Sequence, residues 1–196
     1  MTCSTPLSAI AKRRTDRKPL LLLTLLPDSE LGWKKGLTRM VTQHYCCVVL
    51  PALTTDGLLP PGIHLAEWDE VYAAFGTTPH RRRLLDGFRR AINGLKKAGC
   101  KRVYLDGSFV TGKVSPGDFD GCWDDEHVDF SLLDPILLTF ANGRAAQKIK
   151  FGGELFPAGL VADPATGSIF IDFFQIHKDT GAAKGIIAID LERLQT

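Results

Sequence analysis

The segment 78–100 constrains the fold most, because an amphipathic helix there runs directly into an apolar strand. Apolar side chains recur along it at helical spacing, at Leu84, Phe88, Ile92 and Leu95. Thr78 and Pro79 are typical of a helix start, and Gly99 is typical of a helix stop. The run VYLD follows at once. A helix with one apolar face next to such a strand predicts helices packed against a sheet.

Other patterns extend this prediction along the chain. Helical spacing of Trp68, Val71, Tyr72 and Phe75 predicts a second helix, and Asp134 followed by Pro135 predicts a short third one. Strands are predicted at 103–105 and 119–123, as neighbours in one sheet, with a turn between them. Two further β-rich runs, 167–177 and 185–191, are predicted to pair as a hairpin. The fold class is therefore α+β, with helices packed against a mixed β-sheet.

Charge is spread unevenly over the 196 residues. Residues 1–50 hold eight Lys and Arg against three Asp and Glu, although the net charge of the whole chain is only +2. We therefore expect a basic N-terminal extension over residues 1–49 and one domain over residues 50–196. The extension is either a poorly ordered terminus or an arm for nucleic acid or anionic lipid, and we expect the domain to fold without it. Its run LLLLTLL is too short to span a membrane.

The five cysteines do not follow the spacing of a metal site. Unpaired thiols without such spacing are typical of a reducing compartment, so we expect a cytoplasmic protein. The five histidines are equally scattered.

One face of the helix predicted at 78–100 is strongly basic. It carries Arg81, Arg82, Arg83, Arg89, Arg90, Lys96 and Lys97. This face is either solvated or a surface for a phosphate-rich partner.

The chemistry lies where the first two strands meet. Alternation along a strand places Asp118 and Asp120 on one face with Cys122, about 7 Å apart along the chain. Two carboxylates held so close repel each other, and a divalent cation removes that conflict. Mg²⁺ prefers hard oxygen ligands and is commonly shared between carboxylates and substrate phosphates. A pair that bridges two ions is the arrangement used in phosphoryl transfer.

The turn before this pair supports phosphate binding. Gly107 allows the backbone to approach a ligand closely, and the Ser108 hydroxyl with successive backbone N–H groups can cradle phosphate oxygens. Lys113 can reach a phosphate as a point charge. The spacing differs from that of a Walker A loop.

A resemblance rests on these residues. The stretch GSFVTGKVSPGDFD, residues 107–120, resembles the nucleotidyltransferase superfamily that includes DNA polymerase β. The region from about residue 50 to 191 resembles small bacterial and phage proteins assigned to that superfamily, which are akin to nucleotidyltransferase toxins of toxin–antitoxin systems. The chain departs from the usual pattern after Gly-Ser, where Phe109 and Val110 replace a basic residue.

The resemblance implies roles for individual residues. Gly107 and Ser108 would bind nucleotide phosphates, and Asp118 and Asp120 would hold two Mg²⁺ (or Mn²⁺) ions. A third carboxylate on a later strand would complete the site. Asp172 fits best because it interrupts an apolar run, with Asp190 next and Glu154 third. Arg144, Lys148 and Lys150, beside a Gly-Gly, are candidates for triphosphate or RNA binding, although a polar helix and turn would look the same.

The implied activity is transfer of a nucleoside monophosphate from NTP to a hydroxyl of RNA, such as tRNA, or of protein. The resemblance also implies a cognate antitoxin as a protein partner, and no membrane association is expected. The alternative is a catalytically inactive nucleotide-binding or protein-interaction module.

Overall fold

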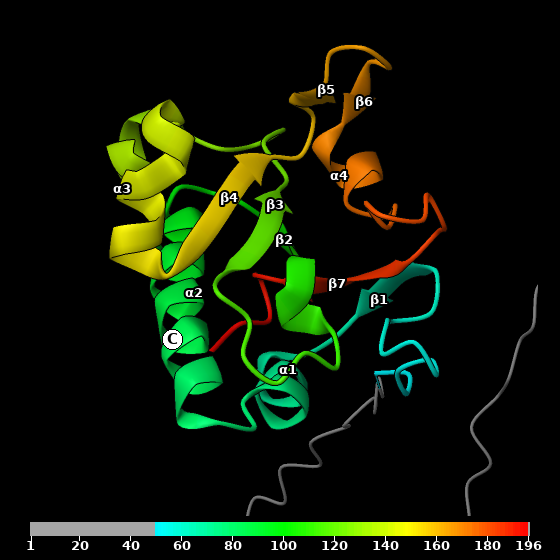
Figure 1. Ribbon diagram of the computed structural model, residues 1–196. Coiled ribbons are helices and arrows are strands. Elements are labelled where there is room, and N and C mark those ends of the chain that lie inside the picture. Colours follow the sequence, from blue (N-terminus) through cyan, green and yellow to red (C-terminus); the bar gives the residue numbers. More distant parts are fainter. Residues whose placement is uncertain (1–49, 196) are drawn as a thin grey trace, which may run out of the picture. The chain divides into compact units, whose positions relative to one another are not determined.

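The computed structural model describes residues 50–195 (Figure 1). The predicted basic extension over residues 1–49, and its separation from the domain, lie outside the described residues. In chain order, the elements are β1 Gly62–Leu65, α1 Trp68–Phe75, α2 Pro79–Lys97, β2 Arg102–Asp106, η1 Gly107–Val110, β3 Phe119–Trp123, η2 Phe130–Leu132, η3 Pro135–Leu138, α3 Ala141–Phe151, β4 Gly153–Pro157, β5 Val161–Asp163, β6 Ser168–Ile169, α4 Phe170–Phe173 and β7 Gly185–Asp190.

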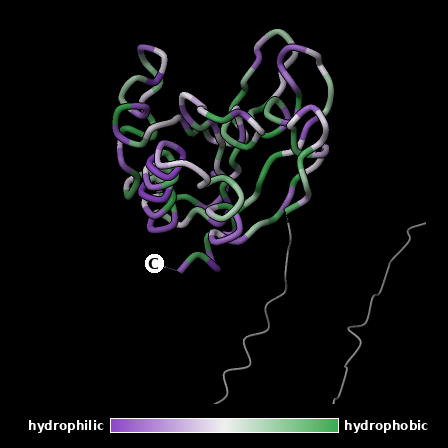
Figure 2. The backbone as a smooth tube through the Cα atoms, turned by 60° about the horizontal axis from the view of Figure 1, so that its bottom comes forward, coloured by the Kyte–Doolittle hydropathy of each residue, from purple (hydrophilic) through white to green (hydrophobic). Residues whose placement is uncertain are grey.

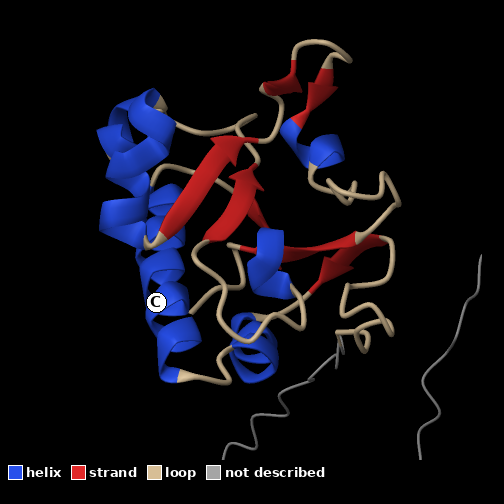
Figure 3. Ribbon diagram, viewed as in Figure 1, coloured by secondary structure: helices blue, strands red, loops and turns tan. Residues whose placement is uncertain are grey.

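A five-stranded mixed sheet organises the domain (Figure 3). Its strand order is β1-β7-β2-β3-β4. The pairs β1/β7 and β3/β4 are parallel, whereas β7/β2 and β2/β3 are antiparallel. The α+β class and the pairing of β2 with β3 are confirmed, and η1 fills the turn between them.

The two faces of the sheet are covered differently. On one face, Val103, Leu105, Phe119 and Leu155 join the main core, where α2 packs through Phe88 at 5.1 Å from the Phe119 ring. On the other face, a smaller apolar cluster is capped by side chains of α4. It contains Tyr104, Cys122, Phe156, Ile186 and Ala188, with Phe170 from α4 and Phe174 directly after that helix. Hydropathy alternates along the helices, as the amphipathic patterns predict (Figure 2).

The helix boundaries follow the predicted capping signals. The Thr78 hydroxyl accepts a hydrogen bond from the Arg81 backbone N–H, which caps α2. The Asp134 carboxylate caps η3 in the same way, by accepting from the Ile136 N–H at 3.1 Å. Both helix starts and the short third helix are therefore confirmed, the last as a 3₁₀ turn.

The predicted strand over residues 167–177 is wrong beyond Ile169. Only β6 is extended, and it pairs with β5 in a separate two-stranded sheet. The chain then turns into α4, because Phe170, Phe173 and Phe174 also fit helical spacing and two of them reach the apolar cluster. The predicted hairpin with 185–191 is reduced to one bridge between Ile176 and Ala183, and β7 pairs with β1 and β2.

The basic face of α2 is also not uniformly solvated. Arg81 is buried and donates hydrogen bonds to the carbonyls of Phe75, Lys113 and Phe109. Its guanidinium lies 4.6 Å from the centre of the Phe109 ring. Arg81 is buried beside the rings of Phe75 and Phe109, which explains why it binds the backbone instead of facing a phosphate-rich partner.

Candidate active site

Carboxylates line up across three adjacent strands of the sheet. Asp106 is the register partner of Asp120, and Asp120 is the register partner of Glu154. Register partners on neighbouring strands share a face of the sheet, and Asp118 joins them two residues before Asp120. Ligand oxygens of Asp118, Asp120 and Glu154 all lie within 4.8 Å of one another. The predicted Asp118–Asp120 pair is therefore part of a larger acidic group.

The ends of the strands explain why these side chains meet. β2 ends at Asp106, β3 begins at Phe119 and β4 begins at Gly153, all at the same end of the sheet. Farther along the same face, the row becomes apolar with Tyr104, Cys122 and Phe156. The sheet thus has a charged end and an apolar middle on one face, and the acidic group lies at the charged end.

Gly107 makes room for this group. It has a left-handed φ of +79°, and a side chain at this position would collide with the carboxylate of Asp120. The structure thus shows a packing role for Gly107 against Asp120, and the approach of a ligand to this backbone stays a prediction. The half-buried Ser108 follows in η1, and its carbonyl accepts a hydrogen bond from the Thr111 hydroxyl at 2.8 Å.

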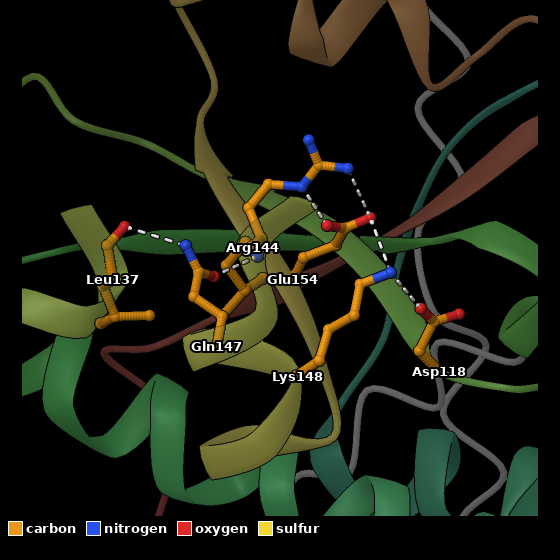
Figure 4. Close-up of polar contacts among 7 residues, drawn as sticks. Asp118, Leu137, Arg144, Gln147, Lys148 and Glu154 are labelled. Atoms are coloured by element: carbon orange, nitrogen blue, oxygen red, sulfur yellow. Dashed lines mark hydrogen bonds and ion pairs between the residues drawn. The ribbon is translucent and has the colours of Figure 1, made fainter. Parts of the chain in front are cut away.

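Two cations from α3 reach the acidic group (Figure 4). Lys148 Nζ lies 2.9 Å from Asp118 Oδ2 and 3.7 Å from Glu154 Oε1, so it bridges two of the three carboxylates. Arg144 donates to both oxygens of Glu154, with Nη2 at 3.3 Å from Oε1. The backbone of Arg144 is left-handed, so the two residues are not related by regular helix geometry, but both side chains reach Glu154.

Gln147 lies between these cations in sequence but faces the protein interior. It is 1% exposed, donates to the Leu137 carbonyl at 3.3 Å and accepts from the Leu155 N–H at 2.9 Å. The second bond satisfies a backbone donor on β4, which is an edge strand. Gln147 thereby fastens α3 to the strand that carries Glu154.

The electrostatics of the group are those of crowded carboxylates. Burial, reinforced by Asp118 and Glu154, raises the pKa of Asp120 to about 7. Hydrogen bonds to Asp118 and to Glu154 raise the pKa values of Lys148 and of Arg144 respectively. Asp120 therefore carries the charge that is hardest to accommodate without a further cation.

A second ion pair borders the group. Asp106 is 5% exposed and pairs with Lys184, which is 12% exposed and comes from the turn before β7. Burial raises the pKa of Asp106, and Lys184 opposes that rise. Sequence reasoning missed both residues. The available signal was an aspartate directly before Gly-Ser at the end of an apolar strand, where a buried charge requires a partner.

The structure corrects the predicted position of the third carboxylate. Asp172 lies exposed in α4 instead of on a strand, outside the acidic group. Asp190, the second choice, binds the Glu192 N–H at 2.9 Å and pairs with Arg193. Glu154, the third choice, occupies the place instead, because β4 pairs in parallel with β3 and brings it opposite Asp120.

Two of the predicted basic residues, Lys150 and Lys113, do not contact the carboxylates of the acidic group. Lys150 pairs with Asp134 on the far side of α3. Lys113 is exposed and borders an open cavity of about 260 Å³ that is also lined by Thr77, Thr78 and Thr111. Of the predicted basic residues, Arg144 and Lys148 are the two that contact the carboxylates.

The donor set suits a hard divalent cation. Asp118, Asp120 and Glu154 offer oxygen atoms alone, and their spacing allows one ion, or two adjacent ions, to be shared. The two thiols of the described region, Cys100 and Cys122, are buried, and the pKa of each is raised chiefly by burial. Neither is suited to compete as a ligand.

Comparison with known proteins yields a family without an assigned activity. A family model described as "Family of unknown function (DUF6932)" matches residues 51–190. This match covers most of the chain, so the chain belongs to that family. No curated protein and no solved structure gives a significant match. Within residues 50–195, none of the helices has the length and apolar character needed to cross a membrane.

Proposed function

We propose that this member of the DUF6932 family is a metal-dependent nucleotidyltransferase. The observation that carries the proposal is the convergence of Asp118, Asp120 and Glu154 beside the Gly107–Ser108 turn. A strand, a Gly-Ser turn, a pair of aspartates on the next strand and a third acid on its neighbour match the resemblance found in the sequence. Glu154 takes the role first given to Asp172.

The reaction would transfer a nucleoside monophosphate from an NTP to a hydroxyl group. The hydroxyl oxygen forms a bond to the α-phosphorus, the bond from that phosphorus to the bridging oxygen breaks, and pyrophosphate leaves. Two Mg²⁺ or Mn²⁺ ions held by Asp118, Asp120 and Glu154 would supply charge neutralisation when bound. The rest of the catalysis is positioning, because phosphoryl transfer requires little covalent chemistry from the protein.

The chain's own groups have distinct roles in this scheme. Ser108 and the backbone N–H groups of η1 would bind phosphate oxygens, since η1 begins next to Asp120. Lys148 and Arg144 would balance the negative charge of the polyphosphate. Glu154, as the third carboxylate of the group, would accept the proton of the attacking hydroxyl.

The acceptor and partners follow from the resemblance. RNA, including tRNA, or a protein hydroxyl is the proposed acceptor, and a cognate antitoxin is the proposed protein partner. The proposed location is the cytoplasm, where the thiols would stay reduced. A nucleotide-binding module without turnover is the second candidate, favoured by the absence of a basic residue directly after Gly107–Ser108.

The decisive experiment incubates the full-length protein with each labelled NTP, Mg²⁺ and either total RNA or cell lysate. Label transfer with pyrophosphate release supports the enzyme, and the double variant Asp118→Asn/Asp120→Asn serves as the inactive control. Magnesium-dependent NTP binding without pyrophosphate release would instead support the binding module.

A further inference from the structure

Lys148 occupies the position where a metal ion would balance the carboxylates. Its ammonium group lies within 4 Å of Asp118 and of Glu154, two of the three residues that could share an ion. Arg144 holds the same Glu154 from the other side. In the metal-free protein, the negative charge of the group is therefore partly neutralised from within.

The two cations are partly exposed to solvent, whereas other side chains of the same helix are buried in the protein. The side chains of Lys148 and Arg144 are 40% and 34% exposed. Gln147 and Phe151 of the same helix are buried. The first turn of α3 is left-handed at Asn142, Gly143 and Arg144, with φ between 50° and 61°. Left-handed backbone is costly for residues other than glycine, and Arg144 adopts it while it is paired with Glu154.

We infer that Lys148 and Arg144 form a polyphosphate subsite that Asp118 and Glu154 block until a divalent ion binds. A bound ion takes over the carboxylates, and the two cations then turn to the phosphates of the nucleotide. Metal and nucleotide binding are thereby coupled, since each ligand releases groups that the other needs. This inference rests on the proposed function and adds to it the coupling between metal binding and nucleotide binding at Lys148 and Arg144.

The test compares Lys148→Met with Lys150→Met in the full-length protein. Lys150 is on the same helix and is similarly exposed at 44%, but it pairs with Asp134 instead of the acidic group. Mn²⁺ binding without nucleotide is measured by electron paramagnetic resonance, and binding of Mg·ATP at saturating Mg²⁺ is measured by calorimetry. Lys148→Gln is a second variant, and thermal melts check that each variant is folded.

The inference requires opposite shifts for the two ligands. Lys148→Met should bind Mn²⁺ alone at least ~5-fold more tightly, because a competing cation is gone, and should bind Mg·ATP at least ~5-fold more weakly. Lys150→Met should match the wild type in both measurements. A merely structural ion pair cannot produce tighter metal binding together with weaker nucleotide binding.

Each other outcome overturns the inference in a recognisable way. Equal Mn²⁺ affinity in wild type and Lys148→Met would show that Lys148 does not compete with the ion. The metal site of the proposed function would still stand. Tighter Mn²⁺ binding with unchanged Mg·ATP affinity would show that Lys148 does not bind the polyphosphate of the nucleotide. If the wild type binds no Mn²⁺ and Lys148→Met binds none either, the proposed function fails together with the inference.

Discussion

Gly107 and Asp120 are packed so closely that position 107 cannot carry a side chain while the Asp120 carboxylate keeps its place. Gly107 begins η1 directly after β2, whereas Asp120 lies in β3, and their contact sets how near η1 lies to the acidic group. The Gly-Ser turn is thus coupled to the carboxylates by packing.

Gly107→Ala should displace Asp120 and weaken Mn²⁺ binding by an order of magnitude or more. It should also lower the free energy of unfolding by about 1–3 kcal/mol, because alanine at φ +79° is strained in addition to the collision. Gly117→Ala is the matched control, since it lies in the following loop and an added methyl group there meets no atom within 4 Å. Urea denaturation and Mn²⁺ titration measure the two effects, and equal results for both variants would contradict this reading of Gly107.

Glu154→Gln should lose turnover by more than about 10²-fold, as expected when a metal ligand or base is removed. It should also bind Mn²⁺ more weakly, because one of three converging carboxylates becomes neutral. Asp172→Asn, which changes an exposed carboxylate outside the group, should retain both properties. Loss of turnover in Asp172→Asn with activity kept in Glu154→Gln would restore the original assignment from the sequence.

Local patterns predicted what local chemistry decides. The helix starts at Thr78 and Asp134, and the two strands around Gly-Ser, follow from capping groups and alternation that lie within a few residues. The pair Asp118 and Asp120 followed from the same alternation.

What depends on strand pairing could not be predicted in this way. Glu154 joins the site because β4 pairs with β3, and Asp106 belongs to the row because β2 does. The run containing Asp172 fits both a strand and a helix, and contact of Phe170 and Phe174 with the apolar cluster decides in favour of the helix. Arg81 looked like part of a solvated face until the carbonyls that it binds were brought together by the fold.

The raised pKa of Asp120, about 7, predicts opposite pH trends for stability and metal binding. Between about pH 4 and pH 7, the folded protein keeps a proton on Asp120 that the unfolded chain has lost. The metal-free protein therefore loses stability as pH rises through this window, and Mn²⁺ affinity increases, because only the ionised carboxylate binds metal.

Asp120→Asn should remove this part of the decline and melt at a higher temperature than the metal-free wild type at pH 8. The free energy of unfolding should rise by about 1–3 kcal/mol, since a shift of one pKa unit corresponds to about 1.4 kcal/mol before the structure relaxes. Thermal melts from pH 5 to pH 8 in the presence of a chelator measure it. Parallel stability profiles for the two proteins would show that Asp120 is not the titrating group.

Lys184→Met should destabilise the domain by about 3–5 kcal/mol, because it leaves the buried Asp106 charge without a partner. The double variant Asp106→Asn/Lys184→Met should recover much of that loss, since no uncompensated charge remains. Chemical denaturation of the wild type, the two single variants and the double variant gives the coupling energy. A coupling near zero would mean that the pair contributes nothing to the stability of the strand end beside Gly107.

Arg81→Met should destabilise the protein by about 3–5 kcal/mol, far more than a surface arginine would. The substitution removes the donors for three backbone carbonyls, of which those of Phe75 and Lys113 are held at 2.6 and 2.7 Å. The third carbonyl belongs to Phe109, in η1, so the loss also loosens the turn that follows Gly107. Methionine retains the apolar contact with the flanking rings but donates no hydrogen bond.

Arg82→Met is the matched control for this prediction. Arg82 is the next residue of α2, is exposed and donates one hydrogen bond, to the Gly76 carbonyl at 2.8 Å. Loss of this hydrogen bond should lower the free energy of unfolding by no more than about 1 kcal/mol. Hydrogen exchange should show faster exchange of the amides of 107–114 in Arg81→Met but not in Arg82→Met, together with weaker Mn²⁺ binding. If both variants exchange and melt alike, Arg81 does not hold the turn in place, and the path from α2 to the acidic group must run through other contacts.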